Sequence, residues 1–412
     1  MSTATGDQAQ PPPAFHSERP RRELARILRR RRRLRAGIVQ LLGAALAIAL
    51  AIVLPGVAVG FNIPSNRAVE MLLAVGAGTV AFIGIVFSLL FLVVQYSSTN
   101  FTPRLNLFRD APIVWRAFAL YTAVVVYSFT ASLVIGRSDY TSGLVPIVAF
   151  AGVLISLVVY RRLQMAAFAS IQLAFTLRQI AERGRGVIDG LYTQPWRPDR
   201  PAEPSERAPD AAAEVHEIRW PRHAATLQVI DVPRVLRAAE RSGTTIAFQV
   251  RSGGTLSEDA VVATATGQVD SALDPAVLKA LTVGDERTFE QDPELPVRLL
   301  ADIALRALSP AVNDPTTAVQ AIDAIDALLR VLATRDLDVG KVAGSDGSVR
   351  VAVPLPTWGD YLEVAFDDVT ALPVLAPSVG GRITRLLDDL AALTTGENAL
   401  ELAPYRRRLI GR

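Results

Sequence analysis

The sequence predicts a membrane all-α bundle of four transmembrane helices, followed by a cytoplasmic α+β domain that is mostly helical. The chain is 50% hydrophobic, and its apolar residues crowd into Ala36–Leu163, whereas the remainder has the composition of an ordinary soluble protein. Ten arginines fall between Arg19 and Arg35, directly before the first apolar stretch. A basic block beside an apolar span holds that end of the helix on the cytoplasmic side.

Four uncharged apolar stretches are long enough to cross a bilayer. A transmembrane helix needs about 20 predominantly apolar residues to span a hydrocarbon core of about 30 Å. The predicted spans lie within residues 36–163 and are Ala36–Gly60, Met71–Val94, Ala117–Ile135 and Gly143–Tyr160. The first stretch is too long for the apolar part of a secretory signal peptide, so we expect it to be retained.

The arginines of the loops predict the orientation of the spans. The first and third loops carry one arginine each, whereas the second loop carries three and Arg161–Arg162 follow the fourth span. Because positive charge is enriched on the cytoplasmic side, we expect a multi-pass protein of the bacterial inner (cell) membrane with both termini cytoplasmic. We expect Arg29, Arg30, Arg31, Arg32 and Arg33 to contact the anionic headgroups of the lipid bilayer.

The segments outside the bundle differ in composition. Residues 1–35 form an Arg-rich cytoplasmic N-terminus that is predicted to be disordered. Residues 164–192 keep a helical periodicity and predict a helix that continues from the fourth span into the cytoplasm. Residues 193–214 are Pro-rich and predict a linker. Residues 215–412 predict the α+β domain, including a helix across Ala272–Val283.

Several classes of chemistry lack the residues that they need. The chain has no cysteine, which excludes disulfides and thiolate metal sites, and its three histidines do not suggest a metal site. Neither lysine follows a phosphate-binding glycine-rich loop, and the motifs of serine hydrolases and zinc peptidases are absent. We therefore expect no enzyme, no cofactor and no metal. The basic block adjoins a membrane span, so we expect no nucleic-acid partner.

The spans contain no ionisable side chain, which argues against a proton relay or a voltage sensor. A pore lined by hydroxyl groups stays possible. The candidate hydroxyls belong to Ser88, Thr122, Tyr127, Ser128, Thr130, Ser132 and Ser156. Alternatively, these groups bond the backbone of their own helix or a neighbouring helix.

In the second loop, polar residues follow the end of the second span, and a short amphipathic segment comes after them. Arg104 and Arg109 are placed to reach headgroup depth, and Arg109 is able to pair with Asp110. Either this loop is an ordinary anchored loop, or it couples the spans to the soluble domain.

A turn between two predicted helices offers a candidate site. Asp314 suits the N-cap of a helix that has Pro315 at its first position. In the structural interpretation, these residues only form a capped turn between two helices. The functional alternative is that Asn313, Asp314, Thr316 and Thr317 together line a site for an ion or a partner.

Three segments carry a resemblance to a known family. They are FSLLFLVVQYSSTNFTPRLNLFRD, DERTFEQDPELPVRLLADIALRALSP and ALSPAVNDPTTAVQAID, and the second includes Arg287, Asp292 and Asp302. Over roughly Ile38 to Leu390 the chain resembles the DUF2254 family of predicted bacterial membrane proteins. The resemblance implies four spans and a cytoplasmic domain, and it implies no activity.

Three functions are compatible with this organisation. The first is a homo-oligomeric channel or conduit whose opening is biased by the cytoplasmic domain. The second is a membrane-anchored scaffold or signalling module without transport activity. The third and weakest is an enzyme that acts on lipid or envelope precursors, for which the sequence offers no recognisable catalytic group. A pore needs a polar stripe along one helix, and the third span comes closest, although Val124–Val126 interrupt its hydroxyls.

The orientation is testable with a compartment-dependent reporter enzyme. Fusions after Gly60 and Gly136 are expected to score outside, and fusions after Arg109 and Arg183 inside, because the arginine-rich loops stay in the cytoplasm. A single fusion on the opposite side contradicts the four-span topology.

Overall fold

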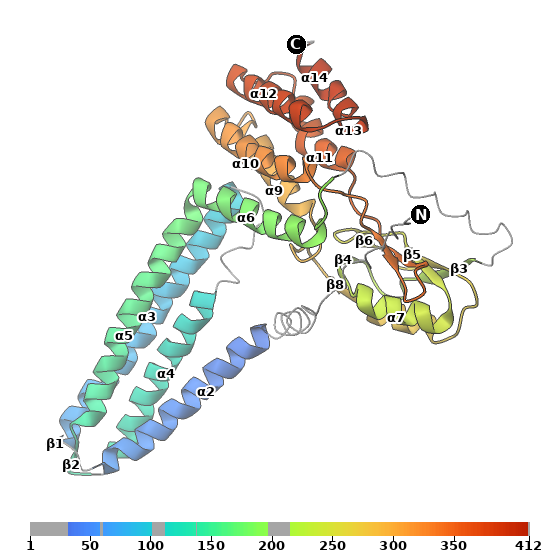
Figure 1. Ribbon diagram of the computed structural model, residues 1–412. Helices are drawn as coiled ribbons and strands as arrows, with labels where there is room; N and C mark the ends of the chain where they lie inside the picture. The colour runs from blue at the N-terminus through green and yellow to red at the C-terminus, as the bar shows by residue number, and fades with distance from the viewer. Residues whose placement is uncertain (1–31, 58–60, 101–111, 137, 197–214, 411–412) are drawn as a thin grey trace, which may run out of the picture. The chain divides into compact units, whose positions relative to one another are not determined.

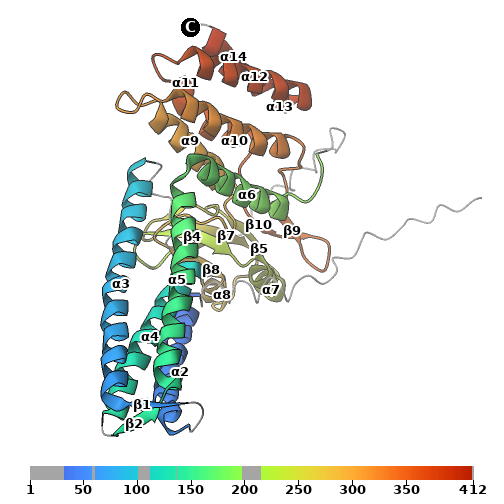
Figure 2. The same cartoon turned by 90° about the vertical axis from the view of Figure 1, so that its left-hand side faces the viewer.

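The computed structural model describes residues 32–57, 61–100, 112–136, 138–196 and 215–410 (Figures 1 and 2). The chain divides into two compact units. The first takes the described residues up to Leu92 and those from Pro112 to Ala167. The second takes Val93–Asn100 and the described residues from Phe168 onward. Each unit is considered by itself.

Four long helices dominate the first part of the chain (Figure 1). They are α2 (Arg32–Val53, followed by the 3-10 turn η1, Leu54–Gly56), α3 (Ser65–Asn100), α4 (Pro112–Ile135) and α5 (Leu144–Ile171). Each contains a stretch that is long and apolar enough to cross a membrane: Gly37–Gly56, Ser65–Val93, Ile113–Ile135 and Leu144–Ala169. The prediction of four apolar spans is confirmed. Helix α3 begins six residues before the predicted span, and its first turns keep Arg67 and Glu70 exposed.

Helix α4 is the most buried of the four and bonds to two neighbours. Gln40 Nε2 on α2 donates to Thr122 Oγ1 at 3.1 Å. Tyr127 Oη donates to the carbonyl oxygen of Val145 on α5 at 2.9 Å. These bonds satisfy polar groups that have no water partner in hydrocarbon.

The two short loops that were predicted to lie outside are paired with each other. Strands β1 (Asn62–Pro64) and β2 (Tyr140–Ser142) form an antiparallel ladder. Two further backbone bonds extend the ladder: Ser65 N–H donates to Asp139 O at 3.0 Å, and Gly143 N–H to Phe61 O at 2.8 Å. The sequence did not predict this pairing, because three-residue strands leave no periodic pattern.

The structure divides the helix that was predicted over residues 164–192. Helix α5 ends at Ile171 and α6 (Leu173–Leu191) begins after Gln172, whose backbone is extended with φ −75° and ψ 123°. No proline or glycine marks this break. One face of α6 packs on α9 (Leu295–Ala307) and α10 (Pro315–Ala333). A side-chain carbon added at Gly184 would approach Pro296 Cβ to 2.6 Å, so this contact requires a glycine.

Two sheets make up the β part of the second unit. The five-stranded sheet has the order β3-β7-β5-β10-β9, in which β10 runs parallel to β5 and the other neighbours are antiparallel. The three-stranded sheet is antiparallel with the order β6-β4-β8. The strands are β3 (Val215–Arg219), β4 (Ala225–Ile230), β5 (Thr245–Phe248), β6 (Thr255–Leu256), β7 (Val261–Thr266), β8 (Leu281–Gly284), β9 (Lys341–Ala343) and β10 (Val349–Ala352).

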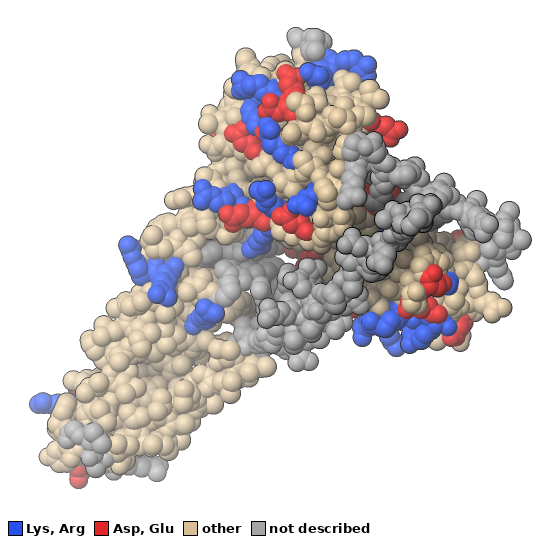
Figure 3. Space-filling model, viewed as in Figure 1, with Lys and Arg blue, Asp and Glu red and all other residues tan. Residues whose placement is uncertain are grey.

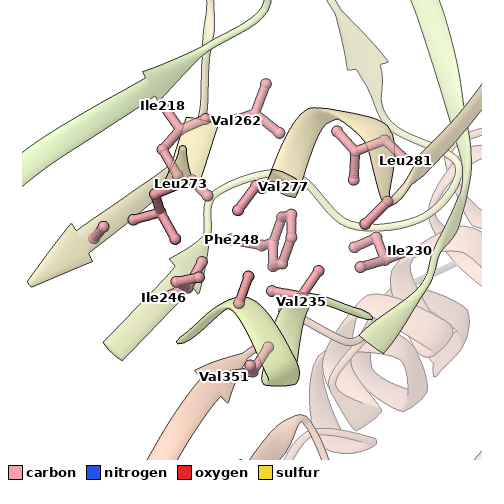
Figure 4. Packing of buried hydrophobic residues seen from close by; sticks show 14 of the residues in the cluster. Ile218, Ile230, Val235, Ile246, Phe248, Val262, Leu273, Val277, Leu281 and Val351 are labelled. Carbon is pink, nitrogen blue, oxygen red and sulfur yellow. The ribbon is translucent and has the colours of Figure 1, made fainter. Parts of the chain in front are cut away.

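One apolar core joins these strands to the helices α7 (Val232–Ser242) and α8 (Leu273–Lys279) (Figure 4). The core includes Ile246 and Phe248 of β5 and Val277 of α8. The helix predicted across Ala272–Val283 is therefore too long. It ends at Lys279, because Leu281 and Val283 leave the helix to pair with β4.

The remaining helices form the α part of the second unit. Besides α6, α9 and α10, they are α11 (Trp358–Thr370), α12 (Pro377–Leu393), α13 (Glu397–Leu400) and α14 (Ala403–Ile410). Helix α10 packs on α9, α12 and α6, and α11 packs on α9 and α14. The chain as described is mostly helical with some sheet, as the sequence predicts.

Candidate functional site

The turn before α10 has the geometry of a helix cap. Asn313 has a positive φ of 47°, a conformation that asparagine tolerates better than most residues. Asp314 then accepts two bonds from Thr317, from its N–H at 3.1 Å and from its Oγ1 at 2.6 Å. These bonds lower the pKa of the Asp314 carboxyl. Asn313 and Thr316 are exposed. Among the described residues, no side-chain hydrogen bond joins either of them to the Asp314 carboxylate.

A second constellation is more buried and brings together distant parts of the chain. Arg287 and Asp292 lie in the segment between β8 and α9 and form a bidentate pair, with Nε to Oδ2 at 2.6 Å and Nη2 to Oδ1 at 2.8 Å. Asp292 is 1% exposed, and it also accepts a bond from the N–H of Leu295 at 3.1 Å. Burial alone would lower the pKa of Arg287, but the bond and the charge of Asp292 raise it above its ordinary value.

Arg251 extends this constellation to helix α11. Its Nη1 donates to Asp360 Oδ2 at 3.0 Å, and Asp360 belongs to the capping box of α11. Its Nη2 lies 2.7 Å from Glu294 Oε2. That oxygen receives no aligned N–H, so the contact is an ion pair and not a hydrogen bond. We name Arg251, Arg287, Asp292, Glu294 and Asp360 the charged junction.

A glycine and a tyrosine pair complete the charged junction. Gly253 has φ +89°, and a side-chain carbon there would collide with the Asp292 carboxylate. Tyr192 Oη and Tyr361 Oη are buried and 2.9 Å apart. Burial raises the pKa of Tyr192 to about 12 and raises that of Tyr361 well above its ordinary value, so both phenols stay neutral. The junction thus connects the β part of this unit to its α part through groups that are mostly satisfied internally.

Hydrogen bonds inside the first unit engage most of the predicted pore liners. Ser88, Ser132 and Ser156 each donate to a carbonyl oxygen three or four residues earlier, at 2.8–3.0 Å. Thr122 and Tyr127 bond α2 and α5, as described above. Each of these serine and tyrosine hydroxyls uses its donor inside the unit, and each hydroxyl oxygen keeps acceptor lone pairs.

Several predicted residues cannot be placed. Arg104, Arg109 and Asp110 lie outside the described residues, as do Arg29, Arg30 and Arg31. Arg32 and Arg33 start α2. The anchored-loop, coupling and lipid-contact interpretations of these residues stay predictions.

The sequence offered a partial signal for the charged junction. Arg287 and Asp292 lie five residues apart in a segment that carries the family resemblance. The other pair of the junction, Arg251 and Asp360, lies 36 and 73 residues from Arg287 along the chain, and no local pattern connects the two pairs. Among the described residues, no group of three or more metal-ligating side chains is found at the junction or elsewhere.

The cap at Asp314 is testable through stability and its pH dependence. Asp314→Ala is expected to lower the free energy of unfolding by about 0.5–2 kcal/mol, while Asp314→Asn and Asp314→Ser largely restore it. Because the folded-state pKa is lowered, the contribution of the carboxylate is present above its ordinary pKa and is lost as the pH falls below it. Thermal melting of the purified chain in detergent across acidic pH measures both effects. If Asp314→Asn kept stability and yet abolished function, the turn would be a charged site.

The charged junction predicts a large and local stability effect. Asp292→Ala leaves Arg287 partly buried without its main partner, which is expected to cost about 3–5 kcal/mol. Asp368→Ala is the matched control, because Asp368 is 57% exposed and lies 3.4 Å from Arg298, and such a surface pair contributes about 0–1 kcal/mol. Denaturant titration followed by tryptophan fluorescence compares the two. Equal losses would show that the junction pair is no stronger than a surface pair.

Comparison with known proteins places the chain in a family. Residues 34–389 match the family described as predicted membrane protein (DUF2254). Relatives include uncharacterized proteins of Mycobacterium tuberculosis and Mycobacterium bovis, each 30% identical over 351 residues. The match covers 82% of this chain and 65% of each relative. No solved structure shows significant similarity to the chain. This chain belongs to the DUF2254 family of predicted membrane proteins.

Proposed function

We propose that this chain is a membrane-anchored scaffold or signalling module. Its four spans hold the α+β domain at the cytoplasmic face of the bacterial inner membrane, and the domain carries the activity. The observation that supports this proposal most directly is the internal bonding of five of the seven candidate hydroxyl groups in the spans. The proposal involves no catalytic reaction.

The outer surface of the first unit supports the same function. Large apolar side chains are exposed along α2, α3 and α5; examples are Leu41, Phe87, Phe91, Phe150 and Leu154. Ser128 is fully buried and does not reach that surface. A surface of this kind suits contact with lipid tails, whereas a pore needs a continuous polar stripe.

A homo-oligomeric channel is the second candidate, and one feature of α3 favours it. Small exposed residues recur at intervals of three and four along this helix: Ala74, Ala77, Ala81, Gly84 and Ser88. Small residues let membrane helices approach each other closely, so copies of the chain are able to pack through this face. A conduit would then lie between copies, with its opening biased by the cytoplasmic domain.

Ion flux separates the two functions. Proteoliposomes that contain the purified chain are expected to leak no faster than protein-free vesicles, because most of the candidate hydroxyls are bonded within each copy. Flux that rises with the amount of protein would instead support the channel.

A matched pair of α3 variants tests the origin of any flux. Ala81→Leu places a large side chain on the small-residue face, whereas Val80→Leu enlarges a neighbouring exposed position that is already apolar. Flux that is lost in the first variant and kept in the second would assign the conduit to packing between copies through α3.

A further inference from the structure

One face of α7 carries arginines that the domain does not use. Arg234, Arg237 and Arg241 are exposed, and at 100° per residue they fall within an arc of about 60°. The opposite face buries Val235 and Ala239 in the apolar core shown in Figure 4. Figure 3 shows basic side chains gathered over α7. We call these three arginines the α7 basic face.

The ends of α7 are fixed, so the three side chains are presented by a rigid helix. Asp231 caps its N-terminus by accepting the N–H of Arg234 at 3.3 Å. Gly243 ends it in the left-handed conformation with φ +67°, which glycine adopts without steric cost. The N–H of Asp231 donates to Ala280 O at 2.9 Å, which brings the exposed Lys279 next to the start of the helix.

Many other arginines of the same unit are held by carboxylates. Arg219, Arg298, Arg330 and Arg382, for example, are each paired with carboxylates. Among the residues that the structure describes, no carboxylate lies within ion-pair distance of Arg234, Arg237 or Arg241. The acid on the helix itself, Glu240, accepts the N–H of Ser345 at 2.8 Å and is thereby directed to the β9–β10 turn. The excess positive charge of this face is therefore free to meet an external anion.

We propose that the α7 basic face docks on the anionic headgroups of the bilayer in which the chain is anchored. This inference rests on the proposed placement of the α+β domain at the cytoplasmic face. The four spans keep the domain beside a lipid surface, and each arginine near an anionic surface favours contact by about fivefold (~1 kcal/mol). The exposed face of α7 offers no large apolar side chain for insertion, so the contact is electrostatic, reversible and sensitive to salt.

Nucleic acid is the other polyanion that such a face could meet. Proteins that bind single strands combine basic grooves with aromatic side chains on which bases stack. Helix α7 contains no aromatic residue. The membrane anchor and this composition favour the lipid surface.

The test uses the full chain in vesicles. Because the chain has no cysteine, Pro233→Cys provides a single labelling site at an exposed position on α7. Quenching of the label by quencher-bearing headgroups is compared between vesicles of phosphatidylcholine and vesicles of equal parts phosphatidylcholine and phosphatidylglycerol. We expect stronger quenching in the anionic vesicles, and we expect this difference to disappear at high salt, where the screening length falls to about 3 Å at 1 M.

Charge-removal variants provide the decisive comparison. Arg234→Gln, Arg237→Gln and Arg241→Gln together keep a good helix former at each position and should reduce the ratio of docked to undocked domain on the order of a hundredfold. In the matched control, Arg306, Arg385 and Arg407, which lie on other helices, are replaced by glutamine, and quenching should stay unchanged. Thermal melting confirms that each variant is folded.

Three outcomes would overturn the inference. They are equal quenching in the two kinds of vesicle, quenching that the α7 variant does not reduce, and an oligonucleotide gel shift that the α7 variant abolishes while lipid composition has no effect. None of them bears on ion flux or on reporter topology, so the failure of this inference is distinguishable from the failure of the proposed function.

Discussion

Hydrocarbon provides no hydrogen-bond partner, and this constraint shapes the first unit. Every polar group within a span has to be satisfied inside the protein or left at a cost of several kcal/mol. Gln40, Thr122 and Tyr127 meet this requirement by bonding between helices, and Ser88, Ser132 and Ser156 meet it within their own helix. The buried hydroxyl of Ser128 has no hydrogen-bond partner among the described residues. These bonds use the hydroxyl donors inside the protein, so the polar side chains of the bundle add to its internal packing.

Charge is distributed unevenly in the second unit. At the charged junction, two guanidinium groups and three carboxylates come from the β5–β6 loop, the β8–α9 segment and the start of α11. A buried pair is weak evidence for stability by itself, but removing one partner is costly, so such pairs fix which elements can pack together. The α7 basic face shows the opposite arrangement, because its arginines project from a fixed helix without carboxylate partners among the described residues. The first pattern belongs to internal architecture and the second to an external surface.

The motif LSPAVNDP illustrates how a distinctive sequence can have a structural explanation. Asn313 supplies a left-handed backbone, Asp314 caps the following helix and Pro315 occupies a first-turn position where its missing N–H costs little. Each residue type fits its local conformation, and the Asp314 carboxylate accepts its hydrogen bonds from Thr317. Exposed side chains at Val312, Asn313 and Thr316 remain on the surface of this turn.

Local pattern alone was sufficient for the four apolar spans and the cap at Asp314, because length, composition and capping chemistry act over a few residues. Tertiary structure decided the rest. Helix α5 ends before Gln172, although no proline or glycine is present there. Leu281 pairs with β4 and does not extend α8. In both places, packing on distant elements outweighs the weak local preference for helix. Similarly, Arg251 and Asp360 meet only because the β5–β6 loop and α11 converge after folding. At the α7 basic face, only the folded arrangement of the described carboxylates left the charges of Arg234, Arg237 and Arg241 without an ion-pair partner.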